Sequence, residues 1–249
     1  MSVHVNPAIV TSGLRYLIDP FNPRSYPTGG TTSTVVDISN NGLNSNLLNG
    51  AFWTNTNTFA SFRCDGINDY ISSGGNADFL AWTPQGSIGS SSLTVEVWLR
   101  TTDGSGTAIS KPWNALAGWN YILSGQNFSV GPVHQSYELT ATQTVTPTYY
   151  DGNVHQLVLW MNSTQYGWSL DGGKESGQDV HGFTSDNPLS RANSGIPLTL
   201  MTQYPYPGFG GNAAISIIGN IYNTKVYTRQ LTATEIAQNF NALRSRYGV

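Results

Sequence analysis

Short apolar runs recur along this sequence, and each is bounded by a cluster of glycine, proline, asparagine or aspartate. Runs of this length are typical of β-strands, because amphipathic helices need longer stretches with apolar residues three and four positions apart. The pattern predicts an all-β protein, an antiparallel β-sandwich of the jelly-roll type. Strands are expected at Leu14–Ile18, Val35–Ile38, Phe59–Cys64, Tyr121–Leu123, Tyr137–Thr146, His155–Asn162, Tyr166–Leu170, Leu198–Thr202 and Ala214–Tyr227.

The clearest predicted strand runs from Ser92 to Arg100. Leucine or valine occupies positions 93, 95, 97 and 99, and polar or aromatic residues alternate with them. Successive side chains of a strand point to opposite faces, so the aliphatic set predicts one face in the core. The other face carries Glu96 and Trp98 and is predicted to point outward, with Glu96 in solvent.

A helix is predicted only near the C-terminus. Thr232 and Glu235 have the spacing of a capping box, in which each side chain binds the backbone N–H of the other residue. Ile236, Phe240 and Leu243 follow at helical spacing. We therefore expect a short α-helix over about residues 233–246 that packs back on the sandwich.

The length of 249 residues fits one large all-β domain. We expect residues 51–249 to form the sandwich, and residues 1–50, which are rich in turn signals, to add an N-terminal arm and edge strands to the same domain. The single cysteine, Cys64, lies in an alternating apolar segment and is expected to be a small buried hydrophobe.

Charged residues make up only 10% of the chain, and the net charge is −3. Without a basic surface there is nothing to neutralise phosphates, so the composition predicts no nucleic-acid partner. No apolar run approaches the ~18 residues of a membrane span, which predicts no membrane partner. The segment Met1–Pro7 lacks the basic and apolar regions of a secretory signal, so we expect synthesis in a cytoplasm.

Patterns of catalytic residues are missing from the sequence. None of the glutamates, Glu96, Glu138, Glu175 and Glu235, lies in the Glu-x-Asp-x-x-Glu arrangement that could supply the paired carboxylates of a retaining glycosidase. No Gly-x-Ser-x-Gly turn is present, and the histidines, His155 among them, have no orienting acid evident in the sequence. We expect no enzymatic activity. The alternative, a polysaccharide hydrolase, requires Glu96 to pair with an acid on another strand.

Two segments place aromatic rings beside amides on predicted loops. They contain Trp113 and Trp119 in one segment, and Tyr204, Tyr206 and Phe209 in the other. Rigid rings of this kind stack on sugars or anchor protein interfaces, so these five residues are the candidate ligand-binding or interface set. In the alternative interpretation the rings cover the ends of the sheets within the same chain.

Three separated stretches occur in a characteristic order: Phe62–Ile71, Asp151–Trp160 and Gly219–Ile236. Together they resemble the laminin-G-like, concanavalin A-like lectin sandwich, an architecture that usually binds and seldom catalyses. The segments Gly13–Pro27 and Asn239–Gly248 are similar to parts of such domains in structural proteins of tailed bacteriophages, including phages of marine and cyanobacterial hosts.

The resemblance implies a non-catalytic protein of the virion surface, with a head decoration or cement protein expected first. Its partners would be the major capsid protein or other virion proteins, and symmetric particles favour a homo-oligomer. The alternatives are a tail fibre or adhesin domain that binds a host glycan, a free carbohydrate-binding module, and the hydrolase described above. The expected location is the virion, after synthesis in the bacterial host cytoplasm.

Calcium is the one cofactor that the resemblance suggests, because lectin-like sandwiches often bind it with loop oxygens. Asp65, Asn68 and Asp69 are the candidate ligands, and Asp103 and Asp151 are further oxygen donors near predicted turns. None of them lies in an EF-hand loop. Asp65-Gly66 and Asp151-Gly152 also form good turns without any metal, so we expect no obligatory cofactor.

Overall fold

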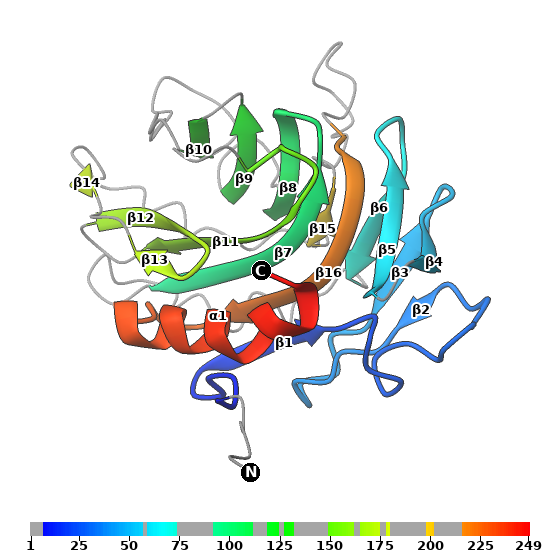
Figure 1. Ribbon diagram of the computed structural model, residues 1–249, viewed down its shortest axis with the longest axis horizontal. Helices are drawn as coiled ribbons and strands as arrows, with labels where there is room; N and C mark the ends of the chain where they lie inside the picture. The colour runs from blue at the N-terminus through cyan, green and yellow to red at the C-terminus, as the bar shows by residue number, and fades with distance from the viewer. Residues whose placement is uncertain are drawn as a thin grey trace.

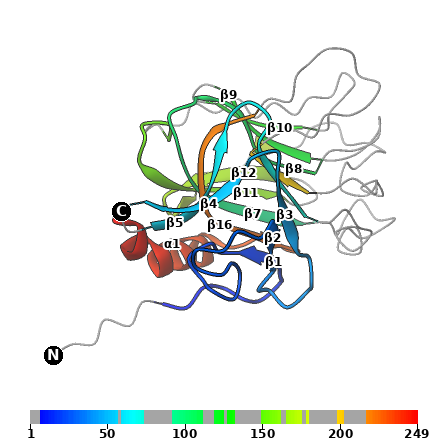
Figure 2. The same ribbon diagram turned by 90° about the vertical axis from the view of Figure 1, so that its right-hand side faces the viewer.

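The computed structural model describes residues 7–56, 59–73, 92–111, 119–124, 127–131, 149–161, 165–174, 178–179, 198–201 and 216–249. In these residues two antiparallel β-sheets pack against each other, and one helix covers the outer side of the larger sheet (Figures 1 and 2). This arrangement confirms the predicted antiparallel sandwich. The predicted strand Tyr137–Thr146 lies outside the described residues.

The larger sheet has nine strands within the described part of the chain. Its main path runs through β13 (Gly173–Lys174), β12 (Gln165–Leu170), β11 (Val154–Met161), β7 (Leu93–Thr101), β16 (Ile218–Tyr227), β5 (Phe59–Asp65) and β4 (Phe52–Thr56). Off this path, β1 (Leu14–Ile18) pairs with β16, and β14 (Gln178–Asp179) pairs with β12. The long strand β16 therefore borders β7 on one side, and β5 and then β1 on the other.

The smaller sheet has seven strands among the described residues. Their order is β10 (Asn127–Gly131), β9 (Trp119–Ser124), β8 (Ser105–Lys111), β15 (Thr199–Leu200), β6 (Tyr70–Ser73), β3 (Ser45–Leu48) and β2 (Thr34–Val35). Residues from the first 50 positions thus enter both sheets, through β1 in the larger sheet and through β2 and β3 in the smaller one.

The main core lies between the sheets. The four aliphatic residues of β7 have no exposed surface there, and they pack with Leu157 of β11, Ile71 of β6 and Ile109 of β8. Each such side chain contributes about 1.5–3 kcal/mol on burial. Cys64 of β5 belongs to the same cluster and is fully buried, which raises the pKa of its thiol. The expectation of a small buried hydrophobe at Cys64 is confirmed.

Helix α1 (Ala233–Tyr247) begins at the predicted capping box, in which Thr232 accepts from the Glu235 N–H and Glu235 binds the Thr232 N–H. The helix lies on the outer face of the larger sheet (Figure 1). There Phe240 stacks on Trp98 of β7 at 5.7 Å between ring centroids. In the part of the chain that the structure describes, no helix has both the length and the apolar character needed to cross a membrane.

Because α1 covers this face, the prediction that β7 turns one face outward is wrong. Thr94, Glu96 and Trp98 have no exposed surface, so β7 is buried on both sides. The alternation of the strand identified its inner face correctly. The pattern could not show that α1, which begins about 130 positions after the end of β7, would cover the other face.

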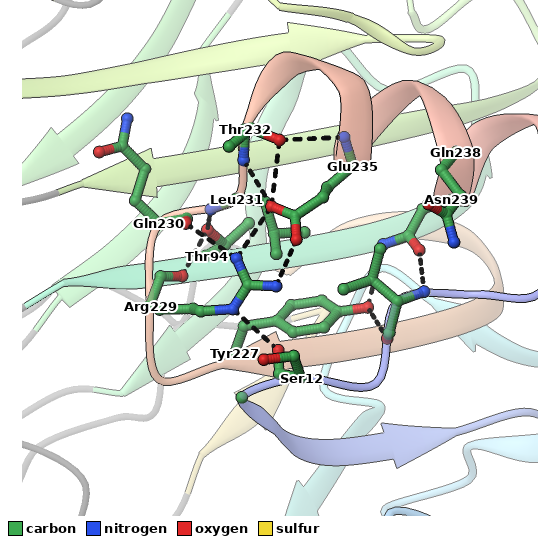
Figure 3. Close-up of polar contacts among 12 residues, drawn as sticks. Ser12, Thr94, Tyr227, Arg229, Gln230, Leu231, Thr232, Glu235, Gln238 and Asn239 are labelled. Atoms are coloured by element: carbon green, nitrogen blue, oxygen red, sulfur yellow. Dashed lines mark hydrogen bonds and ion pairs between the residues drawn. The ribbon is translucent and has the colours of Figure 1, made fainter.

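The N-terminal residues cross beneath α1 and are held mainly through their backbone. The Asn239 amide oxygen accepts from the Val10 N–H at 2.8 Å, and the Tyr227 hydroxyl donates to the Val10 carbonyl at 3.0 Å. Arg229 of the loop after β16 donates to the Ser12 carbonyl and also pairs with Glu235, as Figure 3 shows. This segment ties the start of the chain to its C-terminal helix.

Candidate binding surface at one end of the sandwich

Several turns meet at one end of the sandwich, at the top of Figure 1. They are the β5–β6 turn (66–69), the β7–β8 turn (102–104), residues 149–153 and the start of β16 (216–218), and we refer to them together as the turn-bearing end. Register brings them together, because Ile218 pairs with Asp65, Gly219 with Thr101, and Arg100 with Val154.

Thr101, the last residue of β7, connects three of these turns. Its hydroxyl donates to the Ile218 carbonyl at 2.8 Å and accepts from the Asp103 N–H at 2.9 Å. Its carbonyl accepts from the Gly152 N–H at 3.1 Å. Since its exposed fraction is only 2%, these bonds are shielded from water and fix the turns relative to one another.

The described surface of this end carries exposed apolar side chains. Ile67 is 76% exposed, and Ile218 is 44% exposed on the adjoining strand. Tyr150 is half-buried beside Gly104, and its ring meets the buried ring of Tyr149 edge-on at 5.3 Å. Apolar groups set on a rigid frame of turns suit the apolar faces of a ligand.

Only one of the five aromatic candidates, Trp119, lies among the described residues. Trp113, Tyr204, Tyr206 and Phe209 lie outside the described residues, and Trp119 is described only as the first residue of β9, opposite Lys111. The described residues on either side of segment 202–215 meet at the turn-bearing end, where the Ile217 N–H donates to the Met201 carbonyl at 3.0 Å. Segment 112–118 instead joins β8 to β9 beyond Lys111, at the far end of β8.

The calcium candidates Asp65, Asn68 and Asp69 all lie in or beside the β5–β6 turn. The Asp65 carboxylate accepts from the Ile67 N–H at 2.8 Å, and the Asp69 carboxylate accepts from the Asp65 N–H at 3.1 Å. Asn68 offers its carbonyl to the side chain of Asn49 at 3.0 Å. Asp69 is 4% exposed, and burial raises the pKa of its carboxyl.

The carboxylates of Asp65 and Asp69 therefore stabilise the β5–β6 turn by accepting hydrogen bonds from its backbone N–H groups. Among the residues that the structure describes, no three histidine, cysteine, aspartate or glutamate side chains are grouped as a metal site requires. Asp103 and Asp151 belong to neighbouring turns of the same end, and Asp151 accepts from Asn153 and contacts His155. Calcium binding at Asp65, Asn68 and Asp69 stays a prediction.

Glu96 is not the solvated carboxylate that the sequence predicts. It is completely buried and forms an ion pair with Lys225 at 2.6 Å. Trp98 donates its indole N–H to the same oxygen at 2.8 Å, and Asn239 donates to the other oxygen at 2.7 Å. Helix α1 causes the difference, because it seals this face of β7 and supplies Asn239. A substrate cannot reach Glu96 in this arrangement.

The expectation that His155 lacks an orienting acid is also wrong. Its Nδ1 lies 2.8 Å from Asp171, in the β12–β13 turn, and its Nε2 lies 3.1 Å from Asp151. The Asp-Gly turn at Asp171-Gly172 was the available signal, but Asp171 lies 16 positions after His155 in the sequence. With a carboxylate on each ring nitrogen, His155 has none left for a nucleophile, unlike the histidine of a catalytic triad.

No protein-family model and no curated protein matches this sequence. Several solved structures share its fold. The receptor-binding domain of a botulinum neurotoxin C/D mosaic serotype has a TM-score of 0.65 at 12% identity, over 93% of this chain and 51% of that chain. The binding domain of botulinum neurotoxin DC, solved in complex with SialylT, has a TM-score of 0.62 at 11% identity, over 94% and 52%.

A mutant Trypanosoma rangeli sialidase that displays trans-sialidase activity has a TM-score of 0.58 at 13% identity, over 97% of this chain and 35% of that chain. The chain thus spans about half the length of the two neurotoxin domains and about a third of the sialidase. Identities this low carry information about the fold alone. The chain is a lectin-like β-sandwich with a short C-terminal helix.

Proposed function

We propose that this chain is a non-catalytic recognition domain of a virion surface protein, and that its sandwich binds a glycan. The observation that carries the proposal is the likeness of almost the whole chain to a neurotoxin receptor-binding domain and to a neurotoxin binding domain solved in complex with SialylT. A shared fold does not fix a function, so the surface of the sandwich must supply the rest of the support.

The chemistry of the described residues supports binding over catalysis. Glu96, the one glutamate on the central strand β7, is neutralised by Lys225 under a helix. Both ring nitrogens of His155 are engaged by aspartates. A glycosidase instead needs two carboxylates that face a shared, accessible sugar.

The turn-bearing end is the proposed binding surface. It presents Ile67, Ile218 and Tyr150, and the described residues Met201 and Ser216, which flank the sequence segment that contains Tyr204, Tyr206 and Phe209, lie beside it. Aromatic rings stack on the apolar faces of sugars, while amides and backbone groups nearby bind the hydroxyls. Trp113, in the sequence between β8 and β9, and Trp119, the first residue of β9, form a second, separate candidate.

The test is glycan affinity, measured by calorimetry on the intact chain and on variants. Tyr204→Ala and Tyr206→Ala are each expected to weaken binding about tenfold, which corresponds to about 1.4 kcal/mol. Phe52→Ala is the matched control, because Phe52 is an aromatic residue that is 49% exposed on the edge strand β4. Equal losses in all three variants contradict the proposed surface.

Residues Gly13–Pro27 and Asn239–Gly248, which resemble phage structural proteins, support the placement on a virion. Two roles fit there: an adhesin that binds a host glycan, which the likeness to receptor-binding domains favours, and a decoration protein that clamps capsid subunits as a homo-oligomer. Immunogold electron microscopy of the parent particle separates them. Gold over the tail indicates an adhesin, and gold over the head indicates decoration. Unlabelled particles contradict both roles.

A further inference from the structure

His155 bridges two turns that are far apart in the sequence. Asp151 belongs to the turn before β11, and Asp171 to the turn between β12 and β13. The imidazole lies between their carboxylates, with Nε2 at 3.1 Å from Asp151 and Nδ1 at 2.8 Å from Asp171. Its side chain is 11% exposed, whereas the side chains of Asp151 and Asp171 are 40% and 30% exposed. The bridge is therefore shielded at its centre and open to solvent at its ends.

This geometry requires a protonated ring. An ionised carboxylate only accepts hydrogen bonds, so both ring nitrogens must donate, and only the imidazolium form carries two N–H groups. Other donors also bind both carboxylates. Asp171 accepts from the Gln156 N–H at 2.9 Å, and Asp151 accepts from the backbone and the side chain of Asn153 at 2.8 Å each.

In the neutral form one nitrogen would turn a lone pair toward a carboxylate. The contact with Asp151 should break first, because it is the longer of the two and Asp151 is the more exposed carboxylate. Asp171 also accepts from Gln156 of β11, whereas Asp151 relies on donors of its own turn. Loss of the proton on His155 therefore frees the Asp151 turn first.

The charged groups that shift the pKa of His155 are Asp171 and Asp151. On β7, Arg100 lies opposite Val154 in the register and acts on Tyr222, where burial raises the pKa of the hydroxyl and Arg100 partly opposes that rise. On α1, Arg244 lies over the ring of Phe240. The side chain of Lys174 on β13 is not among the described ones. Among the described groups, Asp151 and Asp171 thus set the charge around the imidazole.

The Asp151 turn is connected to the rest of the turn-bearing end. The Gly152 N–H donates to the Thr101 carbonyl, and the Thr101 hydroxyl donates to the carbonyl of Ile218, the first residue of β16. Tyr150, just before the turn, packs beside Gly104 of the β7–β8 turn. A change at Asp151 therefore has a short, hydrogen-bonded route to the surface formed by these turns.

We propose that His155 is a pH-operated latch, which ties the Asp151 turn to the Asp171 turn when protonated and releases the Asp151 turn when it loses its proton. The latch is a property of the folded chain and stands whether or not the sandwich binds a glycan. It makes the order of the turn-bearing end depend on pH on the alkaline side of 6.5.

The pKa directions agree with the latch. Burial is the largest single effect and lowers the pKa of His155, but the hydrogen bonds and charges of Asp171 and Asp151 outweigh it and raise the pKa above the usual 6.5. Stability from a raised histidine pKa is complete below 6.5 and is lost as pH rises through the pKa of the folded state. The latch is thus closed in mild acid and opens on the alkaline side of 6.5.

The test is an NMR titration of the intact protein, observing the imidazole nitrogens and the backbone amides. The chain has four histidines, so the His155→Gln variant assigns the His155 signals. We expect a pKa above 6.5 for His155, and a decrease of about one unit or more in Asp171→Asn. Asp65→Asn is the matched control, because Asp65 lies at the same end and caps its own turn, and it should leave the pKa of His155 unchanged.

Amide exchange of the Asp151 turn supplies a second readout that needs no variant of the aspartates. The Gly152 and Asn153 amides should lose about tenfold in protection as pH rises through the pKa of His155, and His155→Gln should show no such step. A pKa at or below 6.5 in the unmodified protein overturns the latch. So does the same exchange profile with and without His155.

Discussion

Glu96 and Lys225 form an ion pair 2.6 Å long with no exposed surface on either side chain, beneath helix α1. The pair sits on adjacent residues of β7 and β16 in the sheet register. Trp98 and Asn239 also donate hydrogen bonds to the Glu96 carboxylate. Because Asn239 belongs to α1, this carboxylate joins the sheet to the helix. This contact keeps Glu96 away from any substrate at the surface.

Replacing one member of this pair leaves the other charge buried without its partner. Lys225→Met should reduce the free energy of unfolding by about 3–5 kcal/mol, since a buried charge without its partner is strongly unfavourable. The double variant Glu96→Gln, Lys225→Met should lose less than the sum of the two single losses. Denaturant unfolding of the four proteins measures this coupling, and additive losses contradict the ion pair.

Asn239 connects α1 both to Glu96 and to the N-terminal segment. Its amide donates to Glu96 at 2.7 Å and accepts from the Val10 N–H at 2.8 Å, in full burial. Asn239→Ala should cost about 3 kcal/mol, because it leaves a buried carboxylate oxygen and a backbone N–H without these partners. Asn241→Ala is the control, because Asn241 is exposed on the same helix, and it should change stability by less than about 0.5 kcal/mol.

Glu235 gives the helix start a dependence on pH. The hydrogen bonds from Arg229, with those from Thr232, lower the pKa of its carboxyl to about 2 (Figure 3). A lowered carboxyl pKa adds stability that is present above the ordinary value of 4.5 and is lost as pH falls through about 2. Glu235→Gln should therefore flatten the acid limb of the stability curve, which thermal unfolding between pH 2 and 6 measures. An unchanged limb contradicts this assignment.

Substitutions at two glycines can distinguish the cost of backbone strain from the cost of a steric contact. Gly66 lies in the β5–β6 turn, and Gly42 lies between β2 and β3. Gly66 and Gly42 both have positive φ, +81° and +73°. A Cβ on Gly66 would meet the Ile218 backbone N at 2.9 Å, whereas a Cβ on Gly42 would meet nothing within 4 Å. Gly66→Ala should thus be the more destabilising by about 1–3 kcal/mol. Equal melting temperatures for the two variants contradict the close packing of the β5–β6 turn on β16.

The elements that the sequence predicts well are those with local signals. The capping box at Thr232 places the start of α1, and the predicted helix over about residues 233–246 is observed as Ala233–Tyr247. The alternation over Ser92–Arg100 predicts β7 to within one residue at either end. The Asp171-Gly172 turn has the positive φ values that these residue types indicate, 49° and 81°.

The errors come from contacts between distant segments. The polar face of β7 looks like a solvent face until α1 covers it, and Asp171 acts on His155 from a different turn. Strand β4 was not predicted, because Phe52–Thr56 contains only two apolar residues and pairs at the sheet edge. Short edge strands carry little periodic signal, since only one neighbour and one face constrain them.

In the proposed function, this sandwich binds a glycan and leaves it intact. The most direct measurement is a glycan array probed with the full chain, followed by mass spectrometry of any glycan that it retains. The account predicts retention of a defined set of glycans, recovered uncleaved, with the same result for Glu96→Gln if that variant is folded. A blank array contradicts glycan recognition, and cleavage that disappears in Glu96→Gln contradicts the non-catalytic assignment.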